Sequence, residues 1–521
     1  MRSRSGAPDR RPARLRGAGR PHDHRRIVGT DTGSYRTGMG WLQADNYWLA
    51  RLVVQRGVAA VYVLAFASAV LQLPALLGEH GLLPIPHFVA RMPFRRAPSL
   101  FHFAFSDRLA AGICLLGAVL AAALVAGLPQ AGPAWTSMAV WLAMWLLYLS
   151  VVNVGQIFYA FGWESLLLEA GFLAAFLGSS SVAPPATVLW LFRWLAFRLE
   201  FGAGLIKLRG DDCWRDLTCL YYHHETQPLP GPLSWYFHRL PKSLHRVEVA
   251  ANHFAQVVAP FGLFAPQPAA SVAAGVIIVT QGWLVLSGNF AWLNVLTMLV
   301  AFAALDDTTL RGFHHPPVGA FPEWYMVIVL AVTALALALS YQPARNLVSR
   351  RQLMNAHFNP LHLINAYGAF GSITRQRYEV VVEGTDSPVP DESASWLEYE
   401  FKGKPGDPRR RAPQVAPYHL RLDWLMWFAA MSSPSAHPWF AALLKRILAG
   451  DRRTLRLMRT NPFPDAPPRF VRARLYRYRF TDFAERRRTG AWWTRRLVGD
   501  YARPVSLPDS RPGRANAFRP G

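Results

Sequence analysis

Four charged side chains inside one apolar stretch are the residues best placed for buried chemistry. Arg193, Arg198, Glu200 and Lys207 lie in the segment 186–208, which has the length and apolarity of a membrane-spanning helix. A charge at the centre of a bilayer costs about 2.5–3.5 kcal/mol even on lenient insertion scales. Because Arg193, Glu200 and Lys207 are spaced by seven, they share one stripe, whereas Arg198 points elsewhere. The stripe must therefore face protein, water or itself.

The spacing predicts a ladder of ion pairs inside the bundle, in which the stripe pairs with Glu169 or with itself. Gly202 and Gly204 would let a neighbouring helix approach closely. The alternative is a proton path or a ligand site, because a lysine held away from water, such as Lys207, can act as a base. The predicted intramembrane polar stripe consists of Glu169, Arg193, Glu200 and Lys207.

A polar loop follows this helix and supplies the second set of candidate residues. Its sequence, RGDDCWRDLTC, is too polar for buried packing unless it is richly hydrogen-bonded. It predicts either a rigid loop that caps the bundle or a surface that contacts a client or ligand. The candidate residues of this loop are Arg209, Asp211, Asp212, Cys213, Trp214, Arg215, Asp216, Cys219, His224 and Glu225.

Cys213 and Cys219 lie six positions apart in this loop. They can form a disulfide if the loop faces an oxidising compartment, and free thiols are the alternative. Two cysteines without a second pair are a weak signal for zinc. Cys114 lies in an apolar run and is predicted to be a small buried side chain.

The run His223-His224-Glu225 has the residue types of a metal site. Adjacent histidines, however, cannot easily converge on one ion, and the HExxH pattern is absent. More histidines follow downstream, at His238, His245 and His253. Neither a nucleophile motif nor a pair of catalytic carboxylates is evident. We therefore predict no metal, no cofactor and no catalytic residue.

The elements that position these residues are predicted to be mostly membrane-spanning helices. The 521-residue chain is 52% hydrophobic and 17% charged, against about 25% charged in ordinary soluble domains. Several apolar runs approach the length that a bilayer requires, which predicts the lipid bilayer as a partner. The net charge of +24 lies on no recognisable nucleic-acid-binding module, so no nucleic-acid partner is predicted.

The predicted fold class is a mainly α polytopic membrane bundle of about eight or nine transmembrane helices, followed by an α+β soluble C-terminal domain. The predicted regions are a disordered basic arm at 1–38, a membrane domain at 39–341 with the polar loop 209–246, a soluble domain at 342–505 and a disordered tail at 506–521. Synthesis from Met39 is an alternative start. Alternation predicts strands at 377–383, 396–402 and 469–480, and short helices are predicted at 421–431 and 438–449.

The stretch FRWLAFRLEFGAGLIKLRGDDCWRDLTCLYYHHETQPLPGPLSWYFHRLP resembles the lipase maturation factor family. The resemblance continues through HRVEVAANHFAQVVAPF, QGWLVLSGNFAWLNVLTML and the Asp306-Asp307 pair. It resumes at INAYGAF, YEFKGKPGD, APYHLRLDWLMWFAA and NPFPDAPPRFVRARLYRYRF. The matching segments follow one order from Met39 to about Tyr501.

This resemblance implies a multi-pass membrane protein, resident in the endoplasmic reticulum of animals, that helps dimeric lipases to fold, assemble and leave. The arginine-rich composition favours a bacterial inner membrane here, with the C-terminal domain outside the cytoplasm. The predicted function is a non-catalytic folding factor whose client is lipase-like and is bound through the extracytoplasmic domain and the cysteine-bearing loop. Exposed apolar surface of the soluble domain, rimmed by arginines, would suit such a client. The alternative is a membrane-embedded enzyme similar to the vitamin K-dependent carboxylases, using a quinone-like cofactor. A third possibility is a small-molecule carrier. The oligomeric state is not predicted.

Overall fold

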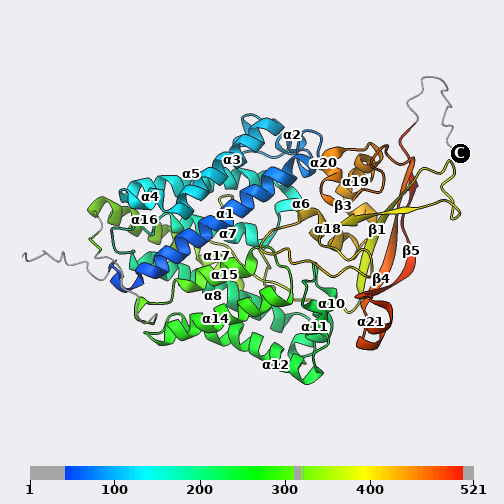
Figure 1. The fold of residues 1–521 in the computed structure, drawn as a ribbon. Coiled ribbons are helices and arrows are strands. Elements are labelled where there is room, and N and C mark those ends of the chain that lie inside the picture. Colours follow the sequence, from blue (N-terminus) through cyan, green and yellow to red (C-terminus); the bar gives the residue numbers. More distant parts are fainter. Residues whose placement is uncertain (1–41, 310–317, 321, 509–521) are drawn as a thin grey trace, which may run out of the picture. The chain divides into compact units, whose positions relative to one another are not determined.

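The computed structural model describes residues 42–309, 318–320 and 322–508 (Figure 1). The predicted disordered arm 1–38, and residues 509–521 of the predicted tail, lie outside the described residues. The described chain consists of a helical part followed by a five-stranded sheet with accompanying helices. A helical membrane part and a sheet-containing C-terminal part were both predicted, and both are present.

Five stretches of the described residues are long and apolar enough to cross a membrane. They are Asp45–Leu76, Asp107–Ala126, Ala134–Val154, Ala269–Ser287 and Glu323–Val348. The helices in them are α1 (Trp48–Leu76), α3 (Asp107–Ala126), α5 (Ala134–Val154), α14 (Ala269–Ser287), α16 (Glu323–Leu339) and α17 (Tyr341–Val348). The helical part is therefore that of a multi-pass membrane protein.

The predicted count of eight or nine spans is not confirmed by the length of the helices. The predicted fourth span is only the 13-residue helix α7 (Gly162–Ala174), and α15 (Leu293–Phe302) has 10 residues. The segment predicted at 247–264 is divided into α12 (Lys242–His253), a π-helical turn (Phe254–Val258) and α13 (Ala259–Gly262). Helix α8 (Ala186–Arg209) has spanning length but carries the buried charges. Composition alone did not reveal where these apolar runs break.

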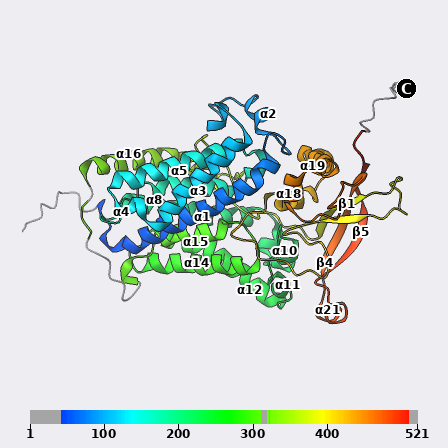
Figure 2. The same ribbon diagram turned by 45° about the horizontal axis from the view of Figure 1, so that its top comes forward.

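Contacts between distant residues define two ends of the helical bundle. At one end the backbone N–H groups of Trp48 and Leu49 donate to the Asp307 carboxylate, at 2.9 and 3.1 Å. At the other end, Asn153 donates to the Pro360 carbonyl oxygen at 3.0 Å, where α5 meets the C-terminal part. Helices α1, α3, α5 and α14 extend between these ends (Figures 1 and 2).

The C-terminal part is built on one antiparallel sheet with the strand order β3-β2-β1-β4-β5. Its strands are β1 (Arg377–Thr385), β2 (Leu397–Phe401), β3 (Met458–Thr460), β4 (Phe470–Phe480) and β5 (Trp493–Val505). Its longer helices are α18 (Arg421–Ala429) and α19 (Pro438–Leu448). The three predicted strands and both predicted helices are present, because each has a clear local pattern.

The helical part and the C-terminal part share one hydrophobic core. Trp163 of α7 and Trp424 of α18 pack with ring centroids 4.9 Å apart. Beside them, Arg421 donates to the buried Glu164 carboxylate at 2.6 Å. A buried ion pair between the two parts holds them in a definite register, because either charge alone would be costly to bury.

Candidate functional site

The buried charges of α8 do not form the predicted ladder of ion pairs. The Arg193 guanidinium donates to the Tyr47 hydroxyl at 2.8 Å and to the Leu263 carbonyl oxygen. The side chains of Gln281 and Gln256 lie at 2.6 Å from Glu200 and 2.7 Å from Lys207. In the described part of the chain no direct ion pair joins two members of the stripe, and each member that is seven residues from the next, about 10.5 Å along the helix, has a partner on another element. Neutral side chains from neighbouring elements, Gln281 and Gln256, bind Glu200 and Lys207 in place of a second charge from the stripe.

Glu169 pairs with Arg198, the residue that the helical spacing had excluded from the stripe. Its carboxylate also accepts hydrogen bonds from the Asn365 backbone N–H at 3.0 Å and from the Tyr367 hydroxyl at 2.8 Å. Asn365 and Tyr367 belong to the INAYGAF segment of the C-terminal part. This segment closes over a charge pair that is buried within the bundle.

A neighbouring helix was predicted to approach both Gly202 and Gly204, but only at Gly204 is the closest neighbour a helical element. A Cβ atom at Gly202 would lie 2.5 Å from the Tyr367 carbonyl oxygen. One at Gly204 would lie 2.7 Å from the Val257 side chain in the π-helical turn. Any larger side chain at either position would push these neighbours away. The close neighbours are thus a C-terminal segment and a π turn.

The polar loop at 209–246, called the cap from here on, folds into short helices. They are α9 (Asp212–Arg215), α10 (Leu220–Thr226), α11 (Ser234–His238) and the start of α12. The structure joins Cys213 and Cys219 by a disulfide, and both are buried with Trp214 against Val249 and Ile373. Asp211 caps α9 by accepting the Cys213 backbone N–H at 3.1 Å. The cap therefore has a small core of its own.

The first turn of the cap is held by residues 370–375 of the C-terminal part. The Asp211 backbone N–H donates to the Gly371 carbonyl oxygen at 2.8 Å, and Arg375 pairs with the Asp211 carboxylate at 2.7 Å. This guanidinium holds the pKa of Asp211 below its usual range. A Cβ atom at Gly210 would lie 2.2 Å from the Gly371 carbonyl oxygen, so only glycine fits there.

Arg377 at the start of β1 holds the second half of the cap. Its guanidinium donates to the carbonyl oxygens of Glu225, Gln227 and Pro228, at 2.9, 2.5 and 3.1 Å. It also pairs with Glu379 at 2.6 Å, and Lys404 pairs with the same carboxylate at 2.8 Å. Burial lowers the pKa of Lys404 to about 8. The Arg377 side chain is fully buried, so water does not replace it as the hydrogen-bond donor to these three carbonyl oxygens.

The cap exposes only part of its predicted functional residues. The exposed members are Arg209, Asp212, Arg215 and Asp216. Asp211 and Glu225 are half-buried, and the buried members are Cys213, Trp214, Cys219 and His224. This distribution favours the rigid loop over a broad contact surface. The residues that clamp the cap, Arg375 and Arg377, were missed because they lie about 160 positions away in the sequence.

An aromatic surface lies where the cap meets the sheet. Its members, called the aromatic–arginine patch, are Leu233, Tyr236, Phe483, Trp492, Arg411 and Arg486. Arg411 and Arg486 lie 5.2 and 3.5 Å from the Trp492 ring centroid. Tyr236 and Phe483 are 42% and 55% exposed, so they face solvent. The predicted arginine-rimmed apolar surface therefore exists here, while Trp493 of the same AWW run is buried.

Comparison with known proteins covers both parts of the chain. The profile of the lipase maturation factor transmembrane domain matches residues 49–312, and that of the lipase maturation factor C-terminal domain matches residues 363–503. Lipase maturation factor 1 of Bos taurus is 41% identical over 90% of this chain and 91% of its own length. Lipase maturation factor 2 of Homo sapiens is 30% identical over 88% of this chain and 83% of its own. No solved structure matches. The chain belongs to the lipase maturation factor family.

Proposed function

We propose that this chain is a membrane-anchored maturation factor that helps a lipase to fold or assemble. Family membership carries this proposal, because relatives named Lipase maturation factor 1 match 90% of the chain at 41% identity. Both halves match, so the membrane part and the C-terminal part are used together. The relatives are named for maturation and not for a reaction, and the carboxylase alternative gains no support from them.

The path of the chain supports a membrane domain at 39–341 with about nine passes, the cap at 209–246 and a C-terminal domain at 342–505. The passes beyond the five long apolar helices are assigned to α7, α8, the α12–α13 segment and α15, which connect the same two ends. An odd number of passes places the C-terminal domain opposite the start of α1. The Cys213–Cys219 disulfide favours an oxidising compartment for the cap. For a bacterial chain this compartment is the periplasm and the membrane is the inner membrane.

We assign client contact to the aromatic–arginine patch. Exposed aromatic rings beside arginines bind incompletely folded chains through both apolar burial and cation–π contacts. Trp235, which supports the patch from below, donates to the Thr481 carbonyl oxygen at 2.8 Å and packs on Phe483 at 4.9 Å. The patch is thus presented on a rigid base formed jointly by the cap and the sheet.

Co-expression with a secreted lipase tests the function directly. The chain is expected to raise the lipase activity per unit of lipase antigen at an unchanged transcript level, because it acts after translation. A secreted enzyme that is not a lipase, expressed in the same cells, is the control and should not respond. Equal specific activity of the lipase with and without this chain would contradict the proposal.

Removing two rings from the patch tests the client surface. The double substitution Tyr236→Ser with Phe483→Ser should weaken lipase capture by at least about tenfold, because exposed aromatic rings carry much of the energy of such contacts. The free energy of unfolding should change by less than about 1 kcal/mol, because both side chains face solvent. Binding is measured with detergent-solubilised full chain and an unfolded lipase.

The matched control is Leu397→Ser, which removes a similarly exposed apolar side chain (43%). Leu397 pairs with Gly384, near the end of β1 that is remote from Arg377 and the cap. This variant should capture the lipase as the unchanged chain does. Equal losses in both variants would assign the effect to general surface hydrophobicity and exclude the patch as the client site.

A further inference from the structure

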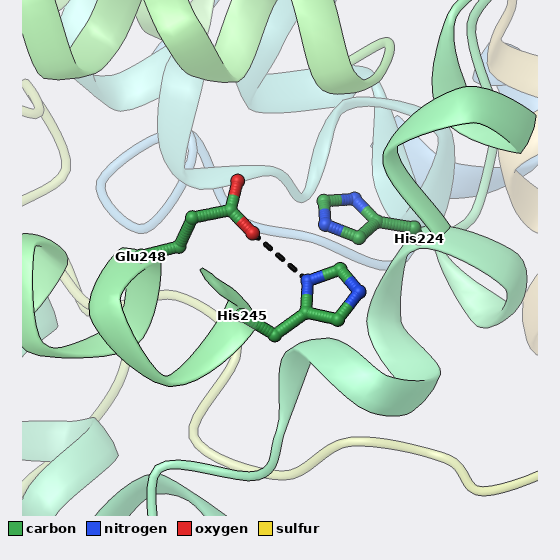
Figure 3. Close-up of side chains that lie close together, drawn as sticks. All are labelled: His224, His245 and Glu248. Atoms are coloured by element: carbon green, nitrogen blue, oxygen red, sulfur yellow. Dashed lines mark hydrogen bonds and ion pairs between the residues drawn. The ribbon is translucent and has the colours of Figure 1, made fainter. Parts of the chain in front are cut away.

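Three potential ligands for a metal ion converge beside the cap. His224 comes from α10, whereas His245 and Glu248 lie three residues apart on α12 (Figure 3). One ligand atom from each of these residues lies within 4.8 Å of the others. The His245 Nδ1 atom lies 2.9 Å from a Glu248 carboxylate oxygen, and the His224 ring approaches from the facing helix.

His224 lacks the partners that a buried polar side chain requires. Its side chain is 3% exposed, and neither ring nitrogen has a hydrogen-bond partner among the described residues. The Nε2 atom of His245 also has none there. Buried polar groups in folded proteins are nearly always satisfied, so the nitrogens of His224 indicate a missing partner, and the His245 nitrogen that such a partner would share with Glu248 is Nδ1.

The geometry at His224 suits this role. An imidazole nitrogen without a hydrogen-bond partner can offer its lone pair to a metal ion. The cations on these elements, Lys242 and Arg246, are both exposed, and Lys242 contacts the Tyr221 ring.

We propose that His224, His245 and Glu248 form a binding site for a divalent transition-metal ion, with zinc as the expected ion. Two imidazoles and one carboxylate are a common zinc ligand set that leaves a fourth coordination position for water. The indole N–H of Trp283 donates to the other Glu248 oxygen at 2.9 Å, which orients the carboxylate as outer partners of metal ligands do.

Such an ion would connect α10 and α12, two helices that the disulfide does not join. The disulfide lies within residues 213–219, whereas the three ligands bring α10 onto α12. Val249, next to Glu248, packs against the core of the cap that contains both cysteines. The site therefore stabilises the cap against the bundle. It also revises the prediction of no metal, because the His224 ring lies beside that of His245, with the ring centroids 5.4 Å apart.

Metal analysis of the purified full-length chain in detergent tests the proposal. After incubation with zinc and gel filtration, the chain should retain about one ion, as a site with three protein ligands predicts. His224→Phe and Glu248→Gln should each lower zinc affinity by at least about tenfold. His80→Ala, which changes an exposed histidine elsewhere, is the control and should retain the ion.

Cobalt substitution gives a readout that does not depend on any variant. The unchanged chain should show visible bands of tetrahedral cobalt without thiolate charge transfer, because the ligands are nitrogen and oxygen. Retention of zinc in Cys213→Ser with Cys219→Ser separates this site from the cysteines. Less than about a tenth of an ion per chain, or a thiolate spectrum, would overturn the proposal and leave a buried water as the partner of His224.

Discussion

Replacing Glu169 with alanine is expected to lower the free energy of unfolding by about 3–5 kcal/mol. The substitution leaves the Arg198 guanidinium buried without its carboxylate, and it removes the acceptor for the Asn365 N–H and the Tyr367 hydroxyl. Thermal or denaturant unfolding of the full chain in detergent measures the loss. Lipase maturation should fall with it, because INAYGAF then loses its anchor on the bundle.

A second substitution separates charge burial from packing at this site. Glu169→Ala combined with Arg198→Met should recover much of the stability, because removing both charges also removes the cost of an unpaired one. Glu79→Ala, at an exposed carboxylate, should have little effect. If the stability losses of Glu169→Ala alone and Arg198→Met alone add up to the loss in the double variant, the two side chains do not act as a pair.

Replacing Arg377 with methionine is expected to release the second half of the cap and to cost at least about 3 kcal/mol. Three carbonyl oxygens of the cap lose their donor, and Glu379 keeps only Lys404 as its cation. Amide hydrogen exchange of Glu225, Thr226, Gln227 and Leu229 should become faster by on the order of a hundredfold, since a loss of this size lowers the local opening energy. Mass spectrometry of peptides cut from the full chain after exchange locates the change.

Arg496→Met is the matched control, because Arg496 is an exposed arginine of β5 on the same sheet. It should leave both exchange and stability unchanged. If Arg377→Met also leaves exchange in the cap unchanged, the cap is held by its own core and by residues 370–375, and the clamp at β1 contributes little. In that case lipase maturation by this variant should equal that by the unchanged chain.

Local patterns predicted much of the architecture. The long apolar runs became membrane-length helices, and the alternation in RFVRARLYRYRF became β4. Strand β5 was not predicted, because its residues are basic and aromatic without a regular period, and it forms by pairing with β4. The predicted number of spans is not confirmed by helix length, because α7 and α15 have only 13 and 10 residues and hydropathy does not record where tertiary packing turns the chain.

The spacing of charged residues along a helix could not predict which buried charges pair with one another. Helical periodicity correctly placed Arg193, Glu200 and Lys207 inside the protein, where all three are buried. It placed Arg198 off the stripe without naming a partner for it, because the face of a helix says nothing about which element covers that face. Glu169 of α7 and the INAYGAF segment cover Arg198 here, and both had to be brought there by the fold.

The sequence by itself determined the membrane character, the charged helix with its polar cap, the strands with clear alternation and the family. These follow from length, apolarity, period and motif order, which are local or directly comparable properties. The tertiary structure alone decided which carboxylate meets Arg198, that Arg377 clamps the cap, and that His224 lies beside His245 and Glu248. Those pairings depend on the rotation and packing of elements distant in sequence, and no local pattern encodes that arrangement.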